Sequence, residues 1–151
     1  MKLRVIRAGS LITLYNGIYA IFYGILILIF RKIIFIEYFS KMPVPWRIFY
    51  RSFPKRADLY YSLLMTNAFF LISFGILIIY LSYFILKRKD KLAWAVLFFA
   101  GIFSWASLFI INFMKGSWFM IVASFIGWAS FVIGMILPVR YYLRKEYPEF
   151  L

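Results

Sequence analysis

Four long segments of the chain contain no Asp, Glu, Lys or Arg, and most of their side chains are apolar. These segments are residues 8–30, 59–86, 92–114 and 116–139. A helix rises about 1.5 Å per residue, so roughly 20 apolar residues cross the hydrocarbon core of a bilayer, which is about 30 Å thick. The pattern predicts an all-α integral membrane protein, with a single domain over residues 1–151 in which four transmembrane helices form a bundle.

The connections between these segments differ in length. Residues 31–58 form a long first loop, whereas residues 87–91 and the turn at Lys115 are short. Because short connections join antiparallel neighbours, we expect the second, third and fourth helices to pack side by side.

The composition excludes a soluble monomer. Hydrophobic residues make up 66% of the chain and charged residues 15%, whereas a soluble domain has about 45–50% and about 25%. A chain of this length has no interior large enough for the excess apolar side chains. The net charge of +13 comes from 18 Lys and Arg against 5 Asp and Glu. Cations that flank membrane spans account for such an excess, so we expect no nucleic-acid partner.

The cations also carry a signal for orientation. The connection at residues 87–91 holds four Lys or Arg, and the turn between the third and fourth helices holds one, Lys115. Short loops rich in Lys and Arg stay in the cytoplasm. We therefore expect a multi-pass protein of the cell (plasma) membrane with both termini in the cytoplasm.

Side chains for catalysis and metal binding are scarce. The sequence has no Cys and no His, and its acidic residues lie outside the uncharged segments: Glu37, Asp58, Asp90, Glu146 and Glu149. Thiol chemistry and the common zinc, copper and iron sites need the missing residue types. Ion-coupled carriers need ionisable groups within the membrane. We expect no catalytic residues, no metal and no cofactor, and neither an enzyme nor a secondary transporter.

Small side chains recur at i, i+4, i+7 and i+11 on two of the predicted helices, where they fall in one narrow stripe of the helix surface. The first helix carries Thr13, Gly17, Ala20 and Gly24, and the fourth carries Ala123, Gly127, Ser130 and Gly134. The third helix has a looser stripe of Ala93, Ala100, Ser104 and Ser107, and the second a partial one of Ser62, Thr66 and Ser73.

These small-residue stripes predict where helix backbones come close together. In lipid there is no hydrophobic driving force between helices, so their association depends on close packing, which small side chains permit. One interpretation is that the stripes hold the four helices of the bundle together. The other is that the first or fourth helix turns its stripe outward to bind a partner protein. We expect Phe131 on the face opposite the stripe of the fourth helix.

Three amides lie within the predicted spans: Asn16, Asn67 and Asn112. An amide in hydrocarbon needs a hydrogen-bond partner on another helix, so their expected role is to join helices, and a substrate contact is the alternative. Trp105 and Trp128 are expected to fill space in the bundle or face lipid, and stacking on a quinone or isoprenoid is the alternative for both.

The first loop contains a pattern typical of a short helix at a membrane surface. Pro45 can begin this helix and Pro54 can end it. Aromatic side chains at i, i+3, i+4 and i+7 fall on one face, while two arginines fall on another. We expect residues 45–53 to lie flat on the membrane, where five side chains meet anionic lipid headgroups: Trp46, Arg47, Arg51, Lys55 and Arg56. A solvated loop is the alternative, and residues 33–39 either continue the first helix or lie on the surface.

Two functions from different classes fit these features. The first is a non-catalytic accessory or scaffolding subunit that binds other membrane proteins, or a second copy of itself, through small-residue helix faces. The second is a module that binds or transfers a lipid or quinone in an apolar cleft, with Asn16, Asn67 and Trp105 as its polar and aromatic contacts. A small oligomeric channel or exporter is a further alternative. An outward-facing stripe favours the first function, and a cleft that opens towards lipid favours the second.

Overall fold

The computed structural model describes residues 2–40, 42–88 and 90–143, and all its regular elements are helices. They are α1 (Lys2–Ser40), α2 (Trp46–Ser52), α3 (Pro54–Arg88), α4 (Lys91–Lys115), α5 (Trp118–Ile136) and α6 (Val139–Leu143). The four helices α1, α3, α4 and α5 are long and apolar enough to cross a membrane. The prediction of an all-α chain with four helices of membrane-spanning length is confirmed for this part of the chain.

The predicted loop at residues 31–58 is wrong in its extent, because most of it is helical. Helix α1 continues past Arg31 and Lys32 to Ser40, since Ile34, Phe35 and two further aromatic residues recur on one face and are buried there. Helix α3 begins at Pro54, a residue that suits the first turn of a helix because no partner is needed there for an N–H. At about 1.5 Å per residue, the 39 residues of α1 span about 58 Å. Both long helices are therefore longer than the hydrocarbon core of a bilayer, which is about 30 Å thick.

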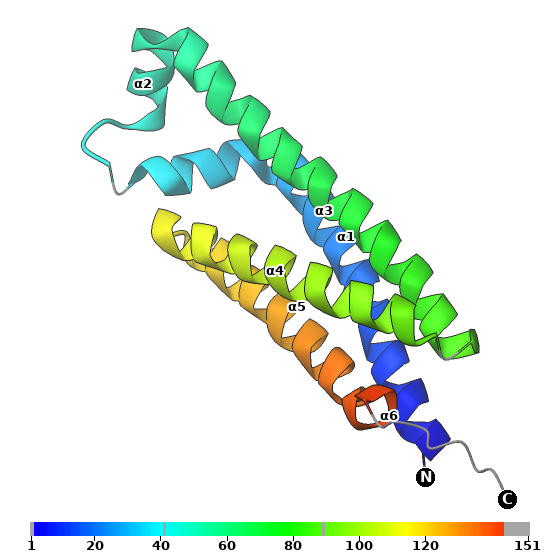
Figure 1. The fold of residues 1–151 in the computed structure, drawn as a ribbon. Helices are drawn as coiled ribbons and strands as arrows, with labels where there is room; N and C mark the ends of the chain where they lie inside the picture. The colour runs from blue at the N-terminus through cyan, green and yellow to red at the C-terminus, as the bar shows by residue number, and fades with distance from the viewer. Residues whose placement is uncertain (1, 41, 89, 144–151) are drawn as a thin grey trace, which may run out of the picture.

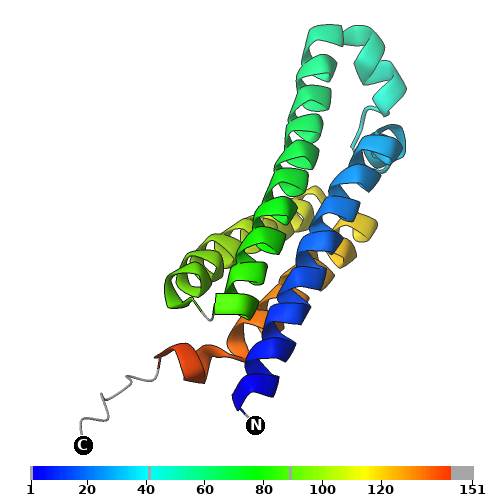
Figure 2. The same ribbon diagram turned by 90° about the vertical axis from the view of Figure 1, so that its right-hand side faces the viewer.

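Helices α1 and α3 run antiparallel and form the most extensive contact between elements. Figure 1 shows α4 and α5 as a hairpin against this pair, with α1 and α3 extending past the turn that joins α4 to α5. Figure 2 shows α1 and α3 side by side, α4 and α5 behind them, and α2 joining the far ends of the long helices. The start of α1 and the end of α5 lie at the opposite end of the bundle from α2.

Short turns with defined caps set the antiparallel order of α3, α4 and α5. Before α4, the carboxylate of Asp90 accepts hydrogen bonds from the N–H groups of Leu92 (2.8 Å) and Ala93 (3.1 Å). After α4, Gly116 adopts a φ of 70°, a left-handed conformation that favours glycine, and Ser117 caps α5. Helix α4 packs on both α3 and α5, so each pair of helices joined by a short turn is in contact as expected, whereas α3 and α5 share little or no contact and α5 packs on α1 instead.

The close contact between α1 and α3 depends on residues with little or no side chain. A Cβ added to Gly75 would lie 2.6 Å from the carbonyl oxygen of Gly17, and one added to Gly24 would lie 2.7 Å from that of Ala68. Both distances are too short for any side chain, so the two backbones are in direct contact. Five of the buried residues of α3 recur every seven positions, which is the spacing of left-handed helix pairs: Ala57, Leu64, Leu71, Ile78 and Ile85.

The stripe on α5 faces the interior of the bundle. Gly134 lies against Thr13 of α1, and a Cβ on Gly127 would collide with the ring of Trp105 on α4. Our placement of Phe131 on the opposite face is wrong. Phe131 is fully buried, and its ring occupies the space over Gly101 of α4. The reason is helical geometry, since four residues turn a helix only about 40° beyond a full circle and leave Phe131 on the same side as Gly127.

The stripe on α1 divides between two neighbouring helices. Gly17 and Gly24 contact α3, whereas Thr13 contacts Gly134 and Met135 of α5. Ala20 is fully buried. The stripes of α1 and α5 therefore hold this bundle together, and the interpretation in which they turn outward to a partner is wrong for both helices.

Candidate lipid-binding sites

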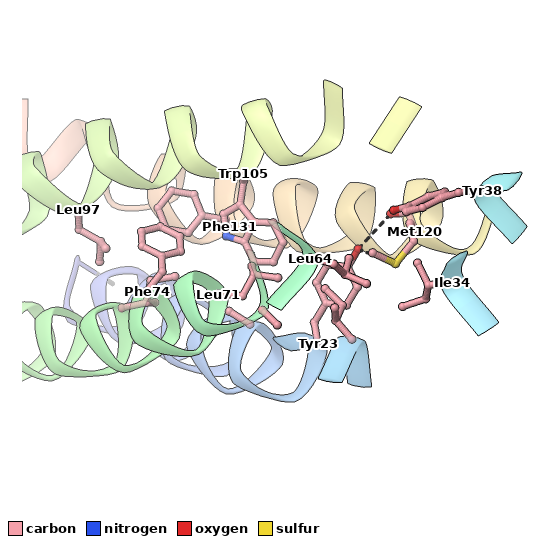
Figure 3. Close-up of a cluster of buried hydrophobic side chains, with 14 of the residues drawn as sticks. Tyr23, Ile34, Tyr38, Leu64, Leu71, Phe74, Leu97, Trp105, Met120 and Phe131 are labelled. Atoms are coloured by element: carbon pink, nitrogen blue, oxygen red, sulfur yellow. Dashed lines mark hydrogen bonds between the residues drawn. The ribbon is translucent and has the colours of Figure 1, made fainter. Parts of the chain in front are cut away.

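Asn16 joins three helices in the centre of the bundle. Its amide NH2 donates to the carbonyl oxygen of Gly127 at 2.7 Å and to the hydroxyl of Ser130 at 2.8 Å, both on α5. Its carbonyl oxygen accepts from the indole N–H of Trp105 on α4 at 3.1 Å. Asn16 and Trp105 are almost completely buried. Figure 3 shows Trp105 in one cluster with Phe131 of α5 and with Leu71 and Phe74 of α3.

A second polar contact lies nearer to the end that carries α2. The amide of Asn112 is within 3.4 Å of the Tyr23 hydroxyl and of the Met120 carbonyl oxygen, and its own oxygen accepts from Tyr38 at 3.5 Å. Asn16 and Asn112 therefore lie between helices, as a joining role requires. Asn67 is half-buried on α3. Asn16 and Trp105 are buried and hydrogen-bonded to each other, and neither lines any of the three cavities described below.

The looser stripe of α4 is only partly covered. Ala100 and Ser104 are half-buried, whereas Ser107 is exposed and its hydroxyl bonds to the Ser104 carbonyl at 3.0 Å. On α5, Ala123 and Ser130 are half-buried. The three residues of the partial stripe on α3 are all exposed: Ser62, Thr66 and Ser73.

Aromatic side chains from three elements form a cluster at the end of the molecule that carries α2, and we call it the aromatic head. Trp46 of α2 is buried, stacks on Phe35 with a centroid distance of 4.6 Å, and meets Phe39 at 4.8 Å and Tyr61 at 5.3 Å. Phe49 lies 5.1 Å from Phe39. A short helix thus lies within the segment we expected to be helical, but Trp46 faces α1 and α3. This differs from the expectation that Trp46 meets lipid.

Several cations surround the aromatic head. Arg47 and Arg51 of α2 and Lys55 and Arg56 of α3 are all exposed, and the guanidinium of Arg56 lies 5.2 Å from the centre of the Phe53 ring. Arg47 and Arg51 also line a cavity of about 420 Å³ between α1, α2 and α3, together with Lys32, Trp46, Tyr50 and Tyr61. The structure therefore divides the four predicted headgroup cations into two pairs, one at this cavity and one outside it.

An apolar groove of about 630 Å³ lies between α1 and α5. Its walls are Tyr19, Phe22, Tyr23 and Leu26 of α1 and Trp118, Phe119, Val122, Ala123 and Ile126 of α5, and Glu37 also lines it. Tyr19 donates to the Ala123 carbonyl oxygen at 2.8 Å, which ties the two walls together. Half or more of the side-chain surface of Phe22, Phe119 and Ile126 is exposed. The groove is therefore open along the side of the bundle.

Glu37 falls within the predicted loop 31–58 but is helical, which agrees with the alternative that residues 33–39 continue the first helix. It lies in α1, within the residues of the first candidate span, and lines the α1–α5 groove. A smaller cavity of about 170 Å³ is lined by Phe35, Tyr38, Phe39, Met42, Tyr60, Leu63, Leu64 and Lys115. The ammonium of Lys115 lies 5.2 Å from the centre of the Tyr38 ring. The end of the bundle that carries α2 thus contains all three of these cavities.

Sequence reasoning missed several residues of these sites. Lys32, Tyr50 and Tyr61 join the 420 Å³ cavity, and the walls of the groove were not predicted at all. A signal for Lys32 existed, because it is the second residue after the first uncharged segment, where residues at headgroup depth are expected. No signal in the sequence pairs α1 with the first turns of α5, since that pairing depends on the packing of the whole bundle.

No family model matches this chain, and neither a curated protein nor a solved structure matches it. The sites above therefore stand on their own geometry.

Proposed function

We propose that this chain is a multi-pass membrane protein that binds a membrane lipid in the α1–α5 groove. The observation that carries the proposal is the groove itself, with a volume of about 630 Å³ and walls that are almost entirely apolar. Binding cavities for small molecules commonly have volumes of about 300–1,000 Å³ and apolar walls with few polar groups. A groove that opens to the side of four spans faces the acyl chains of the bilayer.

Two features of the groove favour a chain-like ligand over a compact polar one. The hydroxyls of Tyr19 and Tyr23 donate their hydrogens to α5, at the carbonyl oxygens of Ala123 and Met120, and so have no hydrogen left to donate to a polar ligand. Glu37 lines the groove as its charged group and lies nearest to the end that carries α2. The ligand that fits is an amphiphile whose apolar chain lies along the groove and whose polar end lies towards α2.

Lipid retention with a matched pair of substitutions on α5 tests this proposal. Ile126 lines the groove and is 51% exposed, and Ile133 lies on the same helix outside the groove and is 55% exposed. Lipid that stays bound through mild-detergent purification is extracted and counted per mole of protein. We expect Ile126→Trp to reduce the retained lipid several-fold and Ile133→Trp to leave it unchanged. Equal retention by both variants and the wild type contradicts the proposal.

A second candidate function is an accessory subunit that binds another membrane protein. The stripes of α1 and α5 are occupied within the bundle, so the supporting observation is the exposed stripe of Ser62, Thr66 and Ser73 on α3. The hydroxyls of Ser62 and Thr66 bond to carbonyls of their own helix at 2.9 Å, and the exposed ring of Phe69 interrupts the stripe between Thr66 and Ser73. Mass spectrometry of co-purifying proteins, with Thr66→Leu as the variant, tests this candidate. A partner that is retained equally by both proteins contradicts it.

A further inference from the structure

The 420 Å³ cavity beside the aromatic head brings three cations from two helices together. Arg47 and Arg51 are four residues apart on α2 and so lie on one side of that helix, and Lys32 reaches the cavity from α1. Figure 1 shows α2 folded over the ends of α1 and α3, which is how residues far apart in the sequence meet here. Tyr50 and Tyr61 provide two hydroxyls, and the buried Trp46 closes the inner side.

These three cations have no ion-pair partner within residues 2–40, 42–88 and 90–143, and no carboxylate lines their cavity. Three like charges in one cavity repel one another, and the repulsion is relieved when an anion binds among them. Guanidinium groups favour phosphate in particular, because their paired N–H groups match two phosphate oxygens at once. The chemistry of the cavity is therefore that of a phosphate site.

The position of the cavity indicates that the phosphate belongs to a lipid. Lys32 is the second residue after the uncharged segment 8–30, and Tyr61 is the third residue of the uncharged segment 59–86. The cavity thus lies at the edge of the apolar part of the bundle, where the phosphates of a bilayer lie. Trp and Tyr side chains are also common at this depth of a membrane.

We propose that Lys32, Arg47 and Arg51 bind the phosphate of an anionic membrane lipid and prefer a phosphomonoester headgroup to a phosphodiester one. A phosphomonoester carries about −1.5 to −2 charges at neutral pH, whereas a phosphodiester carries one. A bound monoester therefore neutralises more of the positive charge of the three cations than a bound diester does. This site shares no residue with the α1–α5 groove, so it goes beyond the function proposed above and does not depend on it.

Binding to the full-length protein in detergent tests the site without the surface charge of a membrane. The probes are short-chain phosphatidic acid as the monoester, short-chain phosphatidylglycerol as the diester, and glycerol 3-phosphate as the headgroup without chains. Native mass spectrometry counts the bound molecules and gives their affinities. We expect one tightly bound phosphatidic acid per chain, weaker phosphatidylglycerol and little glycerol phosphate.

Two double variants that each remove two cations form a matched pair. Arg47→Gln with Arg51→Gln empties the cavity of its guanidiniums, and Lys55→Gln with Arg56→Gln removes the same charge from neighbouring residues outside the cavity. We expect the first to weaken phosphatidic acid binding roughly tenfold or more and the second to leave it nearly unchanged. The groove variant Ile126→Trp should also leave it unchanged, which separates this site from the proposed function. Arg47→Lys with Arg51→Lys keeps the charge and should restore part of the affinity. Such a recovery shows that the loss in the double glutamine variant is not caused by a failure to fold.

Four results overturn the proposal. Equal losses from the two double variants mean that the cations act only through net charge. Equal affinity for the two lipids rejects the preference for a monoester, and equal affinity for glycerol phosphate rejects a lipid as the ligand. Absence of binding to the wild-type protein rejects the site.

Discussion

The indole N–H of Trp105 lies 3.1 Å from the side-chain oxygen of Asn16, and this hydrogen bond joins α4 to α1 in the core of the bundle. The same amide donates two hydrogen bonds to α5. One asparagine therefore satisfies the buried N–H of Trp105, the half-buried hydroxyl of Ser130 and the backbone carbonyl of Gly127. Buried polar groups are costly when they lose a partner, so this network makes the arrangement of the three helices specific.

Substitution of Asn16 by leucine should destabilise the bundle. The change keeps the branch at Cγ and the number of side-chain heavy atoms but leaves the Trp105 N–H and the Gly127 carbonyl without this partner, at a cost of about 1–3 kcal/mol. For a chain of this size, we expect the melting temperature to fall by about 2–4 °C per kcal/mol. Thermal unfolding in detergent measures this, with Asn67→Leu on the half-buried position as the control. If both variants melt together, the network does not join the helices.

Substitution of Gly75 should show how closely α1 and α3 are packed. Even the single methyl of Gly75→Ala would lie 2.6 Å from the Gly17 carbonyl oxygen, so the helices must move apart and lose contact along their length. We expect a loss of about 1–3 kcal/mol for alanine and more for leucine. Ser73→Leu adds a larger group at an exposed position of the same helix and should be nearly neutral. Equal melting of Gly75→Leu and Ser73→Leu contradicts this contact.

Substitutions of Gly101 and Phe131 should have non-additive effects on the stability of the protein. Phe131 is fully buried over Gly101, so Phe131→Ala should cost about 3–5 kcal/mol by leaving a cavity. Gly101→Ala should also destabilise, because the added methyl collides with the ring. Combining Gly101→Ala with Phe131→Leu should recover part of that loss, which a double-mutant cycle measures. Strictly additive effects contradict the contact, and Phe125→Ala at a 49% exposed position is the control.

The helices and their order could be predicted from the sequence, because long uncharged segments and short cationic connections each have a single physical explanation in lipid. The sequence leaves the extent of α1 open, since residues 33–39 either continue the first helix or lie on the surface. Arg31 and Lys32 mark the end of the apolar segment, but a helix can continue in the headgroup region when its apolar face has a partner. For residues 33–39 that partner is Trp46 and its neighbours, and a sequence does not show this contact in advance.

The sequence shows which basic and aromatic residues gather in residues 45–56, but it does not show how they are arranged. The pattern of aromatic residues and arginines in residues 45–53 indicated a contact with lipid headgroups, and Arg47 and Arg51 do line a cavity with an unpaired positive charge. The pattern did not show that Trp46 points inward, because an amphipathic helix presents the same spacing to a protein as to a membrane. The spacing of the stripe on α1 predicts one contact surface, whereas Gly17 and Thr13 contact different helices.

Removal of the Trp46 side chain should release α2 from the long helices. Trp46 is in contact with rings of α1, α2 and α3, so Trp46→Ala opens the aromatic head and exposes the backbone of α2. We expect trypsin to cut after Arg47 and Arg51 several times faster than in the wild-type protein. Ile48→Ala, at a 56% exposed position of the same helix, should leave the rate unchanged. Equal cleavage of both variants means that Trp46 does not hold α2 in place.

Photocrosslinking in vesicles measures most directly whether the α1–α5 groove binds lipid. A phospholipid with a photoactivatable group in its acyl chain is incorporated with the wild-type protein, and the crosslinked residues are identified by mass spectrometry. The proposed function predicts that adducts concentrate on Phe119, Val122 and Ile126 of α5 and that unlabelled lipid competes with them. Adducts spread evenly over the exposed residues of all four long helices, with Ile133 labelled as strongly as Ile126, would contradict it.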